Sequence, residues 1–286
     1  SNDDYEVTDA AQLIWAAENH TGDTIKLMND VTIDSDVTVS KVVTLDMNGK
    51  KIETAGHKFI IASGGNLTIT GNGTFNNSVE AEKKSVGTET VKDTKTILSV
   101  DAGASLTVEN GTFTTVGSQV IRAEGTAVVN GGLFKNTATR VNDGLDSTSM
   151  VSAVGTGANV ALNKVTIEAT TETSDNGIYG VYGANGATIT LGDGVNVHTS
   201  FAAIGLNNTT SNPAVKITVN GGEYKTEAKQ LNNGKYTHFN AVCYLSGNSD
   251  ITINGGKFVA GNENMHIFSI RYANAGMNLT IKDGQF

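Results

Sequence analysis

The sequence has little of several residue types, and each shortage narrows what the protein can be. It has one cysteine, Cys243, in 286 residues, so an internal disulfide framework is excluded. No run of apolar residues is long enough to span a bilayer, and we expect a chain that is not membrane-spanning. There are 20 lysines and arginines against 29 aspartates and glutamates, a formal net charge of -9. This acidic balance argues against nucleic acid as a partner, because phosphate binding needs a basic surface.

What the sequence has instead is one short repeated motif, called the phrase below, which occurs nine times with variations. In the clearest copy, Leu67 and Ile69 alternate with threonines, an Asn/Gly corner follows, and Phe75 closes the phrase. Alternation with period two puts Leu67 and Ile69 on one face of a strand, and Asn and Gly tolerate the positive φ of a sharp turn. The closing residues, which should point back inside, are Ile52, Phe75, Phe113, Phe134, Ile167, Val197, Tyr224, Phe258 and Phe286.

The spacing of the copies predicts a solenoid. Consecutive closing residues lie between 21 and 38 positions apart, which fits one coil and is too short for a full βαβ unit. One copy cannot bury its apolar face alone, so the copies must stack. The content of valine, isoleucine and threonine favours strands over helices. We therefore predict an all-β fold, a single-stranded right-handed parallel β-helix.

The first residues differ from the repeats and predict a cap. Thr8 suits an N-cap, Gly22 suits a stop, and an apolar stripe at helical spacing lies between them. We expect an amphipathic helix from Val7 to Asn19 that covers the open edge of the first coil, with Trp15 packed or half-exposed on it rather than binding a ligand. The predicted stripe is Ala10, Leu13, Ile14 and Ala17.

The predicted organisation is a capping segment, 1–22, followed by a β-helix over 23–286, the two forming one continuous domain. The last copy ends at Phe286 without a cap, which predicts that the natural chain continues or that this end pairs with another surface. Three long charged segments, 76–94, 135–149 and 225–239, leave the same point of their coils. They should project from one side, which in repeat proteins usually marks the working face.

Several stretches resemble a known family. The helix that contains Ala11-Gln12-Leu13, the stretch 22–27 and the stretch 44–49 are similar to the start of bacterial surface proteins with a right-handed parallel β-helix, in the pectate-lyase-like superfamily. The later Asn-Gly-Gly-x-Phe copies resemble its adhesin-like members. The resemblance covers nearly the whole chain and implies a secreted or wall-attached bacterial protein that meets polysaccharide or host glycans. It leaves the activity open, because this scaffold carries lyases, hydrolases and adhesins alike.

The sequence offers few groups for catalysis. Polysaccharide hydrolases on this fold need two or three carboxylates across the scissile bond, and lyases need calcium with a basic residue. The outward positions of the phrases are mostly threonines. The best acidic group is Asp143 and Asp146 beside Arg140, in a long insertion that gives little rigid support. The histidines are scattered, so we expect no metal site and no cofactor.

Three tyrosines form the best candidate binding site. Each of them lies seven positions before the first inward residue of a phrase, so the three should share one column. They are Tyr182, Tyr244 and Tyr272. The same count assigns Ile60, Ser99, Val120 and Ala153 to that column in earlier coils. Two interpretations remain open: an internal stack that fills the core, or an outward strip on which sugar rings stack.

The sequence thus favours a non-catalytic, extracellular or surface-attached adhesin-like protein that binds glycan or polysaccharide through one face of the β-helix. The alternative is a polysaccharide lyase or glycoside hydrolase with its site in the projecting segments.

Overall fold

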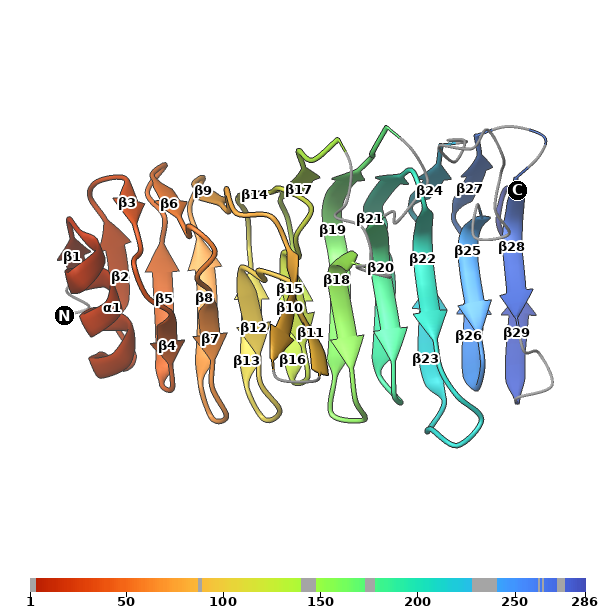
Figure 1. Ribbon diagram of the computed structural model, residues 1–286, viewed down its shortest axis with the longest axis horizontal. Coiled ribbons are helices and arrows are strands. Elements are labelled where there is room, and N and C mark those ends of the chain that lie inside the picture. Colours follow the sequence, from red (N-terminus) through yellow and green to blue (C-terminus); the bar gives the residue numbers. More distant parts are fainter. Residues whose placement is uncertain are drawn as a thin grey trace.

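The chain winds into a parallel β-helix whose coils stand side by side along the long axis of the molecule, with α1 at one end and the two termini at opposite ends (Figure 1). The structure is a computed structural model. It describes residues 4–86, 89–139, 148–172, 178–227, 241–261, 263, 265–271 and 276–286. The predicted all-β solenoid is confirmed: two large sheets contain only parallel strand pairs.

The larger sheet has 18 strands and carries the repeated phrase. The first half of each phrase forms β5 (Val42–Asp46), β8 (Asn66–Thr70), β13 (Ser105–Val108), β16 (Thr126–Val129), β23 (Val215–Val219), β26 (Ser249–Ile253) and β29 (Met277–Ile281). The closing half forms β6 (Lys51–Glu53), β9 (Thr74–Asn76), β14 (Thr112–Thr115), β17 (Leu133–Asn136), β24 (Glu223–Thr226) and β27 (Lys257–Ala260). In the coil before the first phrase, the same places are held by β2 (Thr24–Leu27) and β3 (Val31–Thr32). In two coils both halves are one strand, β19 (Asn159–Ala169) and β21 (Thr188–Thr199).

The smaller sheet has nine strands and closes each coil on its other side. Its strands are β4 (Val37–Val39), β7 (Phe59–Ile61), β12 (Leu98–Val100), β15 (Ile121–Ala123), β18 (Thr148–Val154), β20 (Ile178–Ala184), β22 (Ala202–Asn207), β25 (Ala241–Ser246) and β28 (His266–Arg271). The turns from this sheet into each phrase lie at the lower edge of Figure 1. The segments that return from the closing strands to this sheet include the predicted insertions.

The predicted inward column of closing residues is confirmed for the eight residues from Ile52 to Phe258, which are all buried, whereas Phe286 is exposed. Phe75, Phe113 and Phe134 are paired in register across β9, β14 and β17, and all three are buried. Their ring centroids lie 5.1 Å (Phe75–Phe113) and 5.0 Å (Phe113–Phe134) apart, and Phe59 of the smaller sheet meets Phe75 at 5.3 Å. The core therefore contains an aromatic stack over three successive coils, and the column continues with Ile167 and Val197.

The N-terminal cap differs in detail from the prediction. The helix α1 runs over Ala10–Asn19, whereas Tyr5–Val7 forms a strand, β1, that extends the large sheet by pairing with β2. Thr8 as N-cap was wrong. Asp9 holds that position, since its Oδ1 accepts from the Gln12 amide at 2.9 Å. The side chains of Leu13, Ala16 and Ala17 face the core.

The short runs after the helix form a first coil of their own. The strands β2, β3 and β4 pair in parallel with β5, β6 and β7 of the next coil. At the opposite end, Ile270 and Ile281 occupy inward positions of the last coil and are about half exposed. Phe286 stacks on Phe258 at a centroid distance of 5.3 Å and is 57% exposed.

Candidate functional site

Four of the residues singled out from the sequence, Arg140, Asp143, Asp146 and Tyr272, lie outside the described residues. The structure does place Tyr182 and Tyr244. Both lie on the outer face of the nine-stranded sheet, in one register column with Gly205 between them. The position paired with Tyr244 on the next strand is Ser269. Tyr182 and Tyr244 therefore share one column, as the sequence predicted.

The sequence count was wrong for two earlier coils. Register assigns Arg122 and Ser152 to this column, where the count gave Val120 and Ala153. Val120 and Ala153 are buried inside the coil instead. A fixed count fails here because the turn between the nine-stranded sheet and the phrase varies in length from coil to coil.

The two tyrosines belong to a small aromatic cluster outside the main core. Tyr179 stands at the centre, with ring centroids 5.2 Å from Tyr182, 4.9 Å from Phe201 and 6.4 Å from Tyr244. Gly205 makes the cluster possible, because a Cβ there would lie 2.3 Å from the Tyr179 ring. Tyr179 and Tyr244 are each only 4% exposed although they lie on the outer face. Tyr179 and Tyr244 therefore offer a sugar ring little open face in this arrangement, whereas Tyr182 is partly exposed.

Burial in this cluster raises the pKa of Tyr182 to about 12, and the neighbouring Tyr244 adds to the shift by charge repulsion. The folded-state pKa lies above the unfolded value of about 10, so this contribution to stability is present below pH 10 and is lost as the pH rises towards 12. We expect Tyr182→Phe to flatten this alkaline decline. Denaturant unfolding of both proteins at several alkaline pH values measures it, and parallel profiles would contradict it.

A second surface lies along the Asn/Gly corners between the phrase strands and the closing strands. A hollow of about 420 Å³ opens over three successive coils, with Asn72 and Asn110 on one side and Thr74, Thr112 and Leu133 on the other. Its remaining lining residues are Gly73, Gly111 and Gly132. Glycine is required at Gly132, because φ is +127° and a Cβ would lie 2.7 Å from the Gly111 carbonyl oxygen. The missing side chains leave room for a ligand beside exposed amides.

The amides along this corner are held in line by each other. Asn110 Nδ2 donates to Asn72 Oδ1 at 2.6 Å, and Asn163 Nδ2 donates to Asn130 Oδ1 at 2.8 Å. Asn130 Nδ2 donates in turn to both carboxylate oxygens of Glu109 at 3.1 Å. Each carboxamide keeps donor or acceptor capacity that faces solvent. Sequence reasoning missed this ladder, because the Asn/Gly pairs were interpreted only as turn residues.

A second hollow of about 310 Å³ lies on the same line of corners near the C-terminal end. It is lined by Gly221, Gly222, Gly255, Gly256, Lys257, Asp283, Gly284 and Gln285. Between the two hollows the continuous strands β19 and β21 carry longer side chains at the corner. A Cβ on Gly194 would lie 2.9 Å from the Lys164 stem, and a Cβ on Gly221 would lie 2.4 Å from the Asp193 carboxylate. Lys164 and Asp193 therefore cover the corner in these coils.

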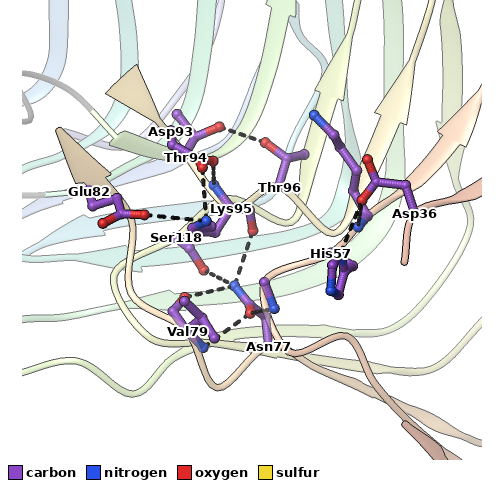
Figure 2. Close-up of polar contacts among 12 residues, drawn as sticks. Asp36, His57, Asn77, Val79, Glu82, Asp93, Thr94, Lys95, Thr96 and Ser118 are labelled. Carbon is purple, nitrogen blue, oxygen red and sulfur yellow. Dashed lines mark hydrogen bonds and ion pairs between the residues drawn. The ribbon is translucent and has the colours of Figure 1, made fainter. Parts of the chain in front are cut away.

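The base of the first long insertion is fixed by a buried amide (Figure 2). Asn77 Oδ1 accepts from the backbone amides of Gly56 at 3.0 Å and Val79 at 3.1 Å. The two hydrogens on its Nδ2 are shared among three acceptors, the carbonyl oxygens of Val79 and Lys95 and Ser118 Oγ, at 2.9, 3.1 and 2.8 Å. All the polar capacity of this side chain is used inside the protein, so it has a structural role.

The insertion itself begins as a hairpin of β10 (Glu82–Val86) and β11 (Glu89–Asp93), which pair antiparallel. Lys95, at its base, lies 2.8 Å from an Asp93 carboxylate oxygen and 3.5 Å from one of Glu82 (Figure 2). This ion pair ties the two ends of the hairpin together where it leaves the coil.

No family model, curated protein or solved structure matches this chain. Its chemistry must therefore be judged from its own residues. In the part of the chain that the structure describes, no group of three or more His, Cys, Asp or Glu side chains lies close enough together to hold a metal ion. Among the same residues, no helix has the length and apolar character needed to cross a membrane.

Proposed function

We propose that the chain is a non-catalytic, extracellular or surface-attached protein of the adhesin-like group of parallel β-helices in the pectate-lyase-like superfamily, and that it binds glycan along its Asn/Gly corner. The observation that carries this proposal is the hollow between Asn72, Asn110 and Leu133. Its volume, about 420 Å³, lies within the range of small-molecule sites.

The chemistry of the hollow suits a sugar. Amides on one side can donate to and accept from hydroxyls, whereas the methyl groups of Thr74 and Thr112 and the Leu133 side chain offer apolar contact. Neighbouring coils repeat every ~4.8 Å, so a polymer of repeating units meets similar groups again along the axis. The net charge of -9 favours a neutral chain over a polyuronate.

The double variant Asn72→Ala/Asn110→Ala should lower glycan affinity by about tenfold or more, since two exposed hydrogen-bonding groups worth about 1 kcal/mol each are removed. A glycan array that includes pectin, alginate and host glycans would identify the ligand, and calorimetry with that ligand would measure the loss. Asn66→Ala, on the outer face of β8 and outside the hollow, is the matched control.

Unchanged affinity in the double variant, with the ligand still bound, would contradict the corner as the site. Release of reducing ends or unsaturated products from any of these polysaccharides would instead support the enzymatic alternative, a lyase or hydrolase.

A further inference from the structure

An exposed aromatic platform lies at the N-terminal end of the molecule, away from the corner. Trp15 of α1 is 52% exposed and is the only tryptophan in the chain. Its ring centroid lies 5.8 Å from that of Tyr5 in β1 and 5.4 Å from that of His20, and the Tyr5 and His20 rings lie 4.3 Å apart. The ring of Tyr5 from β1 and the rings of Trp15 and His20 from α1 and its C-cap therefore form one compact triad.

The Trp15 ring does not serve to close the core, whereas Tyr5 is partly buried against it. The core-facing side of α1 is made by Leu13, Ala16 and Ala17, all buried, so the Trp15 ring lies on another face of the helix.

The platform is held rigid and has a polar rim. His20 Nδ1 lies 2.9 Å from Asp23 Oδ2, which fixes the imidazole, and the Asp23 side chain is 41% exposed. Asn19 Nδ2 donates to the Trp15 carbonyl at 2.8 Å, and Lys41 Nζ donates to the Asn19 carbonyl at 2.8 Å. A fixed ring face beside exposed donors and acceptors loses little conformational entropy when a ligand binds.

We propose that Trp15, supported by Tyr5 and His20, is a second carbohydrate site, one that takes a neutral pyranose of gluco configuration. Such a sugar has a C–H-rich face that packs on an indole ring, while its equatorial hydroxyls reach the polar rim. The Asp23 carboxylate accepts hydrogen bonds from hydroxyls and repels a uronate or sialate. The site does not depend on the corner groove.

The single tryptophan makes the test direct, because all indole emission comes from Trp15. Titration of the protein with cellohexaose should change the tryptophan emission and reach saturation, whereas a galacturonate hexamer should give no change. In Trp15→Ala the affinity for cellohexaose, measured by calorimetry, should fall at least tenfold, and Trp15→Phe should retain part of it. Trp15 is exposed and alanine is a good helix former, so the variant should fold.

Three results would overturn the proposal. The first is an emission that stays constant at millimolar cellohexaose, and the second is an affinity that survives in Trp15→Ala. The third is an emission that changes with protein concentration in the absence of sugar, which would assign the platform to a second copy of the chain. The Asn72→Ala/Asn110→Ala variant should keep the Trp15 response, so failure of this site and failure of the corner site are distinguishable.

Discussion

Phe113→Ala should lower the free energy of unfolding by about 3–5 kcal/mol, the largest effect we expect from a single substitution. Phe113 is completely buried in the middle of the aromatic stack, with Phe75 and Phe134 at 5.1 and 5.0 Å in the neighbouring coils. Parallel strands on both sides hold these coils in register, so the surroundings cannot collapse into the cavity. Denaturant unfolding followed by circular dichroism measures the loss.

Thr114→Ala is the matched control, because Thr114 is the next residue on β14 and lies on the outer face. Its effect should stay within about 0.5–1 kcal/mol. Equal losses in the two variants would mean that the stack does not hold the coils together.

Asn77→Ala should cost about 3 kcal/mol or more, because several buried partners lose their hydrogen bonds at once. The Asn77 side chain is the hydrogen-bond partner of three backbone groups: the amides of Gly56 and Val79 and the carbonyl oxygen of Lys95. The loss should be local to the base of the insertion. Hydrogen exchange at Gly56 and Val79 should accelerate more than exchange in β13 or β16.

Asn110→Ala provides the comparison, since its amide is exposed and its removal takes a partner from only one part-buried donor, the Gly111 backbone amide at 2.8 Å. We expect the free energy of unfolding of this variant to lie within about 1 kcal/mol of that of the parent. A uniform rise in exchange across all coils of Asn77→Ala would contradict a local role for the amide.

The sequence predicted the fold well because the phrase encodes side-chain parity and a constant distance to the closing residue. Val108 and Phe113, for example, lie five positions apart and both face the core. The alternation of side chains does not predict the lengths of the turns outside the phrase. The register of Arg122 and Tyr182 in one column is therefore visible only in the backbone pairing of the strands.

The candidate sites were harder to predict for a different reason. The sequence placed Tyr182 and Tyr244 in one column, but burial of Tyr244 depends on packing against Tyr179, which the repeat pattern does not contain. The amide ladder arises because consecutive corners bring Asn72 beside Asn110, and only the stacked register reveals that neighbourhood. Trp15 was expected to be packed or half-exposed on the cap, and its contact with Tyr5 depends on a strand, β1, that the sequence did not indicate.

If glycan binds along the corner as proposed, the covered corner at β19 and β21 sets a length threshold for it. From β17 to β24 there are three coil-to-coil steps, about 14 Å at the usual strand spacing. A short oligomer can occupy one hollow, whereas a longer chain passes over Lys164 and Asp193 and reaches both. Once the first hollow is filled, the second encounters its part of the same molecule at a high effective concentration. Degree of polymerisation would then discriminate between ligands made of the same sugar.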